Sequence, residues 1–372
     1  MSELPAGPRR ASQVSGLPQP VLIVGTGLIG ASLGQALRRR DVTVWLADAD
    51  PAALAVAVGR GAGVPAPGTH VPPSLVVVAV PPAATAGVVG EALARFPGAV
   101  VTDVASVKVP VQRALDATGA DVRRYVGGHP MAGRELSGPA AARADLIDDR
   151  PWVITPHPAA EPGAVAAVQE LALAARALPV LMPAEEHDRA VAVVSHAPQV
   201  LSSLLAARLL DSSELAVSIA GQGLRDMTRI AASDPHLWVE ILSANAAQVA
   251  EVLADVRADL DVLLDALRSA DHGRAEVLDD TLRRGNAGRA RVPGKHGARP
   301  APVVELPVAV ADAPGELGRL FAAVAAAGVS VEDVRIEHVL GRPTGVVELS
   351  VGAGIAEALA EALRQGGWDV RG

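Results

Sequence analysis

A histidine stands in a stretch rich in glycine, residues 127–138, with the sequence Gly-Gly-His-Pro-Met-Ala-Gly-Arg-Glu-Leu-Ser-Gly. An imidazole titrates near neutral pH, so the neutral side chain of His129 is suited to accept a proton from a substrate hydroxyl. A lone histidine is more often a structural residue with a satisfied hydrogen bond. We expect His129 to lie in a loop after two glycines, and this position favours the functional interpretation.

A second group of glycines, about a hundred residues earlier, matches a phosphate-binding pattern. Gly25-Thr26-Gly27-Leu28-Ile29-Gly30 fits G-x-G-x-x-G directly after an apolar run and at the start of an expected helix. The glycines permit a tight turn and a close approach of the backbone to pyrophosphate, while the helix N-terminus carries partial positive charge. The motif alone is common, but its context predicts a dinucleotide site formed by these six residues.

Asp48 ends the next apolar run, where a carboxylate would bind the ribose hydroxyls of adenosine. A carboxylate at this point repels a 2′-phosphate, so NAD is expected as the cofactor and NADP is disfavoured. The alternative role for Asp48 is a turn or helix N-cap residue before Pro51. Asp50 suits that role better.

Two further turns follow strand-like runs, Val80-Pro81-Pro82 and the segment from Asp103 to Lys108. Ligands of open parallel sheets lie beyond the carboxyl ends of the strands, so both turns are expected to flank the nicotinamide. The two prolines also serve simply to end a strand. Ser106 is also suited to cap the next helix, and both roles are compatible with a place in the cleft.

The composition indicates a globular chain of several domains. With 372 residues, two or three domains are expected, and the low aromatic content of 2% means that Ala, Val and Leu must build the cores. The absence of cysteine excludes disulfides and thiolate chemistry and fits a cytoplasmic enzyme. A net charge of -8 argues against nucleic-acid binding. No membrane span or secretory signal is expected either.

Strand-like runs and helical segments alternate in the first part of the chain. The runs 20–24, 42–47, 75–80 and 99–104 are short and apolar, and helical spacing separates them, as in residues 28–40. This order is typical of parallel crossovers, and buried parallel strands are nearly continuous apolar runs. We predict a Rossmann domain over residues 20–160 after a disordered tail of residues 1–19.

Long helices are expected next, at residues 189–210 and 236–284, with charges recurring on one face. They predict an all-α substrate or dimerisation domain over residues 161–285. A homodimer is expected, although helix packing within one chain would give the same pattern. Residues 286–302 are basic and rich in Gly and Pro, which favours a flexible linker over a contact with nucleic acid or acidic lipid.

The chain beyond the linker forms a separate domain over residues 303–372. It is expected to contain strands at 303–310, 329–339, 345–351 and 368–371 and helices at 315–327 and 354–365. The resulting order, strand-helix-strand-strand-helix-strand, is the ferredoxin-like arrangement. The predicted fold class is therefore α/β, with a Rossmann domain, an all-α domain and a ferredoxin-like domain.

Several segments together resemble the prephenate and arogenate dehydrogenase family over about residues 20–284. The motifs are Gly-Thr-Gly-Leu-Ile-Gly-Ala-Ser at 25–32, Asp-Val-Ala-Ser-Val-Lys at 103–108, the histidine stretch at 127–138, Glu-His-Asp at 186–188, Ser-His-Ala-Pro at 195–198, Arg-Asp-Met-Thr-Arg-Ile-Ala at 225–231, Ser-Asp-Pro at 233–235 and Trp238. Their order and spacing are specific. The C-terminal domain resembles an ACT module, whose first ligand loop is similar to residues 312–317.

The resemblance implies NAD-dependent oxidative decarboxylation of prephenate to 4-hydroxyphenylpyruvate, in tyrosine biosynthesis. By this analogy His129 takes the proton of the C4 hydroxyl, and Ser106 orients the imidazole or the hydroxyl. Arg229 would hold a substrate carboxylate, because a guanidinium binds carboxylate bidentately. The alternative for Arg229 is an ion pair with Asp226, three residues earlier on a helical turn.

Three more residues gain a substrate-binding role from the resemblance. It places His196 near the cleft and His187 at its rim, although either histidine could instead form an interhelical hydrogen bond. Glu135 belongs either to a polar network over the site or to an exposed loop. The two histidines lack the spacing of a zinc pair, so no metal is expected.

Gln199 departs from the family pattern, because many members that use prephenate have a second histidine there. The substrate preference is therefore open.

Two alternative functions remain. Arogenate dehydrogenase, which yields tyrosine, is the first alternative. A non-catalytic amino-acid sensor is the second, although a sensor would need none of His129, Ser106 and Arg229. The ACT-like domain implies tyrosine as an effector.

Overall fold

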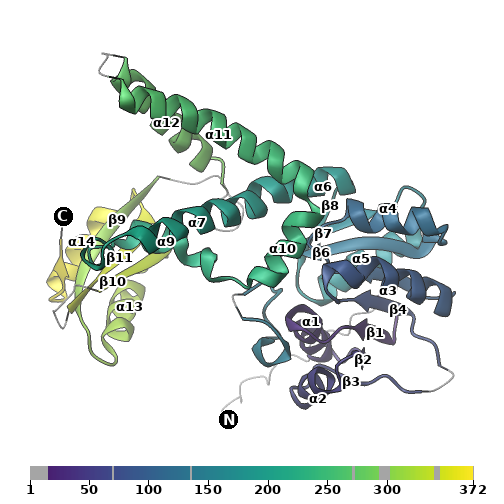
Figure 1. Cartoon of the computed structure of the whole chain (residues 1–372). Coiled ribbons are helices and arrows are strands. Elements are labelled where there is room, and N and C mark those ends of the chain that lie inside the picture. The colour runs from purple at the N-terminus through teal and green to yellow at the C-terminus, as the bar shows by residue number, and fades with distance from the viewer. Residues whose placement is uncertain are drawn as a thin grey trace, which may run out of the picture. The chain divides into compact units, whose positions relative to one another are not determined.

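The computed structural model describes residues 16–68, 71–134, 136–269, 273–292, 302–338 and 344–371. The chain divides into two compact units, Met1–Val256 and Arg257–Gly372. Figure 1 shows the helices and strands of the whole chain. Residues 16–19 of the predicted N-terminal tail belong to the described part of the chain. Leu17 is buried in the first core, and the side chain of Gln19 accepts a hydrogen bond from the Thr43 amide at 3.0 Å.

An eight-stranded sheet forms the centre of the first unit, in the order β3-β2-β1-β4-β5-β6-β7-β8. Strands β1 to β6 are parallel, β7 is antiparallel to β6, and β8 is parallel to β7. The Rossmann prediction is confirmed, but β3, β7 and β8 were not predicted. The strands are β1 (Val21–Val24), β2 (Val44–Ala47), β3 (Val64–Pro65), β4 (Leu75–Val78), β5 (Val100–Asp103), β6 (Tyr125–Pro130), β7 (Pro151–Pro156) and β8 (Leu178–Leu181).

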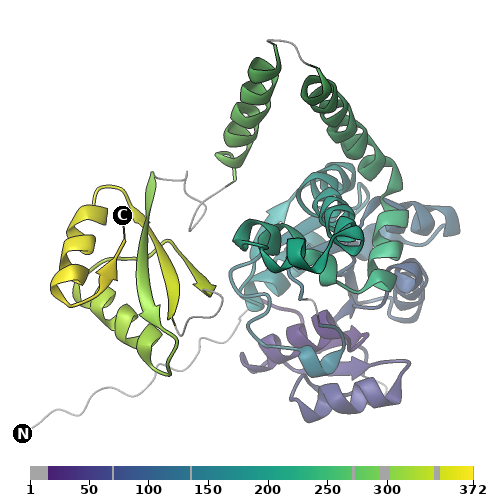
Figure 2. The same cartoon turned by 60° about the vertical axis from the view of Figure 1, so that its left-hand side comes forward.

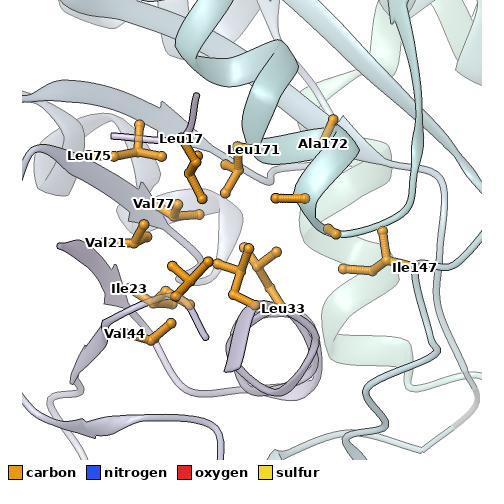
Figure 3. Close-up of a cluster of buried hydrophobic side chains, with 14 of the residues drawn as sticks. Leu17, Val21, Ile23, Leu33, Val44, Leu75, Val77, Ile147, Leu171 and Ala172 are labelled. Atoms are coloured by element: carbon orange, nitrogen blue, oxygen red, sulfur yellow. The ribbon is translucent and has the colours of Figure 1, made fainter. Parts of the chain in front are cut away.

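Helices cover both faces of this sheet because successive strand residues point to opposite sides. Val21 and Ile23 of β1 join the core beneath α1 (Leu28–Arg38), α2 (Pro51–Gly59) and α5 (Pro162–Ala174), part of which Figure 3 shows. Leu22, between them, belongs to the opposite core with α3 (Pro82–Arg95) and α4 (Val109–Thr118). Between β5 and β7 the chain also forms two short 3₁₀ turns, η1 (Val122–Arg124) and η2 (Pro139–Ala141).

A helical region follows the sheet, as predicted. Its elements are α6 (Ala184–Val191), the π-helix η3 (Ala192–His196), α7 (Ala197–Ala207), η4 (Arg208–Asp211), α8 (Glu214–Ser218), α9 (Gln222–Thr228), η5 (Arg229–Ala232), α10 (Pro235–Ala244), α11 (Ala246–Arg268) and α12 (Arg274–Arg289). The expected long helix at 236–284 is interrupted, since α10 and α11 meet at 93° around Asn245. Helix α12 extends into the segment predicted as linker, whose residues 293–301 lie outside the described part.

One helical run is long and apolar enough to cross a membrane by length and composition alone, namely Ala184–Asp211, and the bent pair α10 and α11 would pass as a second. Helices packed inside soluble proteins pass the same test. The run also holds His187, Asp188 and His196, all of them buried in the protein. Its apolar character is therefore weak evidence for a membrane.

The C-terminal sheet is antiparallel, in the order β10-β11-β9-β12. Its elements are β9 (Val303–Ala311), α13 (Glu316–Ala326), β10 (Asp333–His338), β11 (Thr344–Gly352), α14 (Ala356–Gln365) and β12 (Asp369–Val370). Both helices pack against one face of the sheet (Figure 2). The predicted ferredoxin-like arrangement is confirmed.

Candidate active site

The turn between β1 and α1 has the geometry of a phosphate-binding loop. Gly25 has a φ of +97°, and a Cβ there would overlap the carbonyl oxygen of Ala79, so only glycine fits. A Cβ on Gly30 would overlap the carbonyl oxygen of Gly25. At Gly27, the N-cap of α1, a Cβ would meet no atom within 4 Å among the described residues. The helix N-terminus is therefore open to an anion at Gly27.

Asp48 is held against this turn. Its Oδ2 accepts hydrogen bonds from the amide of Thr26 at 2.6 Å and from its hydroxyl at 2.7 Å, and its Oδ1 accepts from the amide of Asp50 at 2.9 Å. Partial burial opposes these bonds, but they prevail and lower the pKa of Asp48. Asp50 is the N-cap of α2, as expected, and accepts from the amide of Ala52.

The Val80-Pro81-Pro82 turn leads from β4 into α3, with Pro81 at the N-cap and Pro82 in the first turn. The strand ends at Val78, two residues earlier than predicted. Glu240 of α10 accepts a hydrogen bond from the amide of Ala83 at 3.4 Å. The helical region therefore reaches the edge of the sheet where the cofactor is expected.

His129 lies on a strand, so its expected loop position is wrong. β6 continues through Pro130 because the unpredicted strand β7 pairs with it, and His129 is opposite Val153. The two preceding glycines are needed for packing. A Cβ on Gly127 would lie 2.5 Å from the Thr155 hydroxyl, and one on Gly128 would lie 2.7 Å from the Asp103 carbonyl oxygen.

A buried charge network supports the strand from behind. The ammonium of Lys108 forms an ion pair with Asp103 and donates to the carbonyl of Gly128 at 2.6 Å. The hydroxyl of Tyr125 donates to the other oxygen of Asp103 at 2.7 Å. Burial lowers the pKa of Lys108, although Asp103 opposes the shift, and burial raises the pKa of Tyr125 well above its usual value. Lys108 thus holds the peptide group that precedes His129.

His129 contacts a second histidine. Its Nδ1 lies 2.9 Å from Nε2 of His187, whose Nδ1 lies 2.7 Å from Oδ1 of Asp188. Burial, followed by the nearby His187, Lys108 and His196, holds the pKa of His129 well below its ordinary value. His129 is therefore neutral at pH 7, as a proton acceptor must be. The expected place of His187 at a rim is wrong, because its side chain is fully buried.

His196 ends the π-helix η3, a distortion that is frequent at functional sites. Nδ2 of Asn245 lies 3.1 Å from Nδ1 of His196 and donates to the carbonyl of Asp188 at 2.8 Å. The ring of Trp238 meets the imidazole edge-on, with centroids 6.0 Å apart. Burial lowers the pKa of His196 to about 4, against the opposing effect of Asp188.

Gln199 and Arg229 are linked through the backbone. Nε2 of Gln199 donates to the carbonyl of Ile230 at 3.0 Å, so the buried amide holds the segment that begins at Arg229. Arg229 itself is exposed at the start of η5. Its neighbour Asp226 accepts a hydrogen bond from Gln222 at 2.8 Å.

Two predicted site residues, Ser106 and Glu135, make no described hydrogen bond to the residues around His129. The side chain of Ser106 makes no hydrogen bond to another described residue, and its expected capping role belongs to Asp188, which accepts the first amides of α4. Glu135 lies outside the described residues. The sequence analysis placed Asp103 and Lys108 only in a turn beside the nicotinamide and did not predict their ion pair, and it assigned no role to Tyr125 or Asn245. The signal was present for Asp103 and Lys108, since charged residues bordering an apolar strand indicate a buried pair.

Comparisons with known families cover most of the chain. Residues 33–180 match the family described as prephenate dehydrogenase, nucleotide-binding domain. Residues 183–283 match the prephenate dehydrogenase dimerization domain.

Individual relatives agree with these families. The chain is 38% identical to the probable prephenate dehydrogenase NovF of Streptomyces niveus, over 93% of this chain and 98% of that protein. Prephenate dehydrogenase from A. aeolicus, solved with hydroxyphenyl propionate and NAD+, is 27% identical with a TM-score of 0.62, covering 72% of this chain and 98% of that one. Synechocystis arogenate dehydrogenase is 26% identical with a TM-score of 0.60 and the same coverage.

Proposed function

The chain belongs to the prephenate dehydrogenase family, and from this premise we propose that it converts prephenate and NAD to 4-hydroxyphenylpyruvate, carbon dioxide and NADH. The observation that carries the proposal is the burial of His129 at the end of β6, which lowers the pKa of its imidazole, in the same sheet that carries the open phosphate turn. The enzyme is an oxidoreductase of tyrosine biosynthesis.

His129 acts as the base in this proposal. It accepts the proton of the C4 hydroxyl while hydride leaves C4 and the ring carboxylate departs as carbon dioxide, and the imidazolium then returns the proton to the C4 oxygen to give the phenol. Loss of the carboxylate makes the ring aromatic, so the ring itself supplies the driving force. The protein has to hold the substrate, exclude water and keep the imidazole neutral, which burial of His129 achieves.

Arg229 is proposed to bind a substrate carboxylate, because its guanidinium is permanently charged. Gln199 holds the next residue, Ile230, and thereby limits the movement of this segment. Ser106 is proposed to contact the substrate hydroxyl. Its partly exposed side chain follows β5, the strand next to β6, and it has no other described partner.

NAD is proposed as the cofactor, since the residues of the turn fit it. Gly27 leaves room at the N-terminus of α1 for a pyrophosphate, and Asp48 presents a carboxylate where the ribose hydroxyls would lie. The bound nicotinamide supplies the hydride acceptor. Val80, Pro81 and Pro82 precede α3 at the same edge of the sheet and are proposed to border the nicotinamide.

Arogenate is the second candidate substrate. The hydrogen bond of Gln199 supports this candidate. Because Nε2 of Gln199 donates to the carbonyl of Ile230, Oε1 remains the atom of the amide that can meet a substrate. Oε1 is an acceptor and suits the ammonium of arogenate better than the keto group of prephenate. The same reaction at the ring would then yield tyrosine.

The helical region contains a dimerisation domain, and we propose a homodimer. Its exposed apolar side chains include Val194, Leu204, Leu210 and Ile219, of which Leu210 is 87% exposed. We also propose that the C-terminal domain binds tyrosine as an effector. The cytoplasmic location and the domain boundaries given above remain predictions.

The test is an assay of the purified protein with prephenate and arogenate, each with NAD and with NADP. We expect prephenate with NAD to give the highest kcat/KM, measured from the absorbance of the reduced nicotinamide. A higher kcat/KM for arogenate would assign the second substrate. Absence of turnover with either substrate would contradict the proposed function.

A further inference from the structure

Three buried side chains form a row behind the proposed base. Nδ1 of His129 faces Nε2 of His187 at 2.9 Å, and Nδ1 of His187 faces Oδ1 of Asp188 at 2.7 Å. The three residues are 9%, 0% and 1% exposed, so bulk water does not compete for these contacts. Each nitrogen in the row must therefore be either a donor or an acceptor toward its neighbour.

Asp188 determines the direction of the row. Its two oxygens accept the amides of Lys108 and Val109, each at 2.9 Å, at the N-terminus of α4. A carboxylate can only accept hydrogen bonds, so Nδ1 of His187 must carry the shared proton. Nε2 of a neutral His187 is then an acceptor, and His129 must donate to it from Nδ1.

His129 consequently has its lone pair on Nε2. We propose that His187 and Asp188 are positioning residues that hold His129 in the tautomer protonated at Nδ1, which leaves Nε2 to take the proton of the substrate hydroxyl. This inference deepens the proposed function and rests on it, because it names the atom that acts as the base. In this arrangement Asp188 accepts hydrogen bonds from the backbone of α4 and from His187 at the same time.

The backbone of Asp188 arranges His196 in the opposite way. The carbonyl of Asp188 can only accept, so the group of Asn245 that faces it at 2.8 Å must be the amide nitrogen. The same nitrogen therefore donates to Nδ1 of His196. His196 then carries its proton on Nε2. His129 and His196 therefore differ in role, since Nε2 is an acceptor in His129 and a donor in His196.

The charged and titratable groups around His129 belong to several elements. Lys108 and Asp103 lie at the junction of β5 and α4, His187 and Asp188 lie on α6, and His196 ends η3. The pKa of His129 is lowered by burial first and by His187, Lys108 and His196 next. The active neutral form is lost only as the pH falls through this lowered pKa. The acid limb of kcat/KM should therefore lie below the usual histidine range.

The first experiment compares two replacements of His187. His187→Gln keeps a carbonyl oxygen that can accept from Nδ1 of His129, whereas His187→Leu removes the acceptor. We expect His187→Leu to lower kcat about 10²-fold with little change in the KM for prephenate, since the base would occupy the wrong tautomer. His187→Gln should recover roughly tenfold or more of this loss. Equal kcat values for the two variants, both folded by thermal melting, would overturn the proposal.

A matched control is available on the surface. His157 contacts Asp116 at 3.1 Å, with Asp116 mostly exposed, so it is a histidine–carboxylate pair outside the row. His157→Leu should leave kcat and the pH profile unchanged. Asp188→Asn is a second test of the His129–His187–Asp188 row. It should lower kcat and shift the acid limb of the pH profile of kcat/KM. A purely structural effect of this replacement would leave the acid limb in place.

The second experiment observes the tautomer directly, without turnover. ¹⁵N NMR of histidine-labelled wild-type protein should show Nδ1 of His129 protonated and Nε2 unprotonated, with the signals assigned by their absence in His129→Asn. The reverse tautomer would overturn the proposal. If neither prephenate nor arogenate is oxidised, the proposed function fails, while the NMR result still decides the tautomer.

Discussion

The two sheets of this protein bury different kinds of side chain. Among the described residues, every buried polar or charged side chain lies in the first unit except Ser350 of β11. The core of the C-terminal unit consists mainly of Val, Leu and Ala, and it includes the buried side chains of Leu320 on α13 and Leu359 on α14. The larger sheet buries Lys108, His129 and Asp188 beside an equally apolar core.

Burial of charge is unfavourable unless every group finds a partner, so a fold that needs only stability avoids it. The C-terminal sheet follows that rule. The larger sheet departs from it at the carboxyl ends of β5 and β6, where the buried groups form one continuous set of hydrogen bonds around His129. This difference supports the proposed place of the chemistry at the carboxyl ends of β5 and β6.

The largest effect on catalysis should follow from His129→Asn. An amide cannot accept and release the proton as an imidazole does, so kcat should fall by ~10²–10⁴-fold. NAD binding, measured by titration calorimetry, should stay nearly unchanged because the phosphate turn is untouched. Ser350→Ala in the C-terminal sheet is the control and should leave kcat unchanged. Wild-type turnover in His129→Asn would show that His129 is not the base of the reaction.

The largest effect on stability should come from Lys108→Met. Removing one partner of a buried ion pair leaves Asp103 uncompensated, which should cost about 3–5 kcal/mol in the free energy of unfolding. Urea unfolding measures this change. The exposed pair of Arg283 with Asp279 is the control, and Arg283→Ala should cost no more than about 0.5 kcal/mol.

The double variant Lys108→Met with Asp103→Leu sharpens the result, because replacing both partners restores an apolar interior. It should be more stable than the single variant and still have low activity, since the support for the Gly128 carbonyl is gone. Full activity in the double variant would show that the buried pair has no part in arranging His129.

Gly27→Ala should separate cofactor binding from folding. A Cβ at Gly27 meets no described atom within 4 Å, so the melting temperature should stay within about 1 °C, whereas the KM for NAD should rise about tenfold or more as the methyl group enters the pyrophosphate space. Gly25→Ala is the contrasting variant. Its Cβ would overlap the Ala79 backbone, so this variant should lose stability as well. An unchanged KM for NAD in Gly27→Ala would contradict the proposed pyrophosphate site at this turn.

The smallest effect on turnover should come from removing the C-terminal sheet. A chain that ends at Val292 keeps all the residues around His129, so kcat should stay within about twofold of the full chain, while inhibition by tyrosine should disappear. Initial rates with and without tyrosine measure both. Tyrosine inhibition that persists in the shortened chain would contradict the proposed effector role of this domain.

Much of the fold could be predicted because it depends on local patterns. Apolar runs of four to six residues predicted β1, β4 and β5 within two residues of their observed ends, and Asp50 was identified as a helix cap. The C-terminal order of strands and helices was predicted in full. β7 and β8 were missed because they carry Pro151, Pro156 and Pro179, which interrupt the pattern of a strand.

The site could be predicted only in part. The motif Glu186-His187-Asp188 showed that an imidazole and a carboxylate are neighbours in the chain, yet it did not show that both are buried. Gln199 was expected to contact the substrate, and its hydrogen bond to Ile230 came from the packing of α7 against η5. Such contacts join residues far apart in sequence, and no local pattern encodes them.

The sequence by itself determined the kinds of element, the phosphate turn with its glycines, and the residue types available for proton transfer, because each depends on a few neighbouring residues. Only the tertiary structure decided which of those residues act together. His129 is a strand residue because β7 pairs with β6, and it lies next to His187 because α6 packs against α4. Burial then sets the protonation state of His129, and burial is a property of the folded chain as a whole.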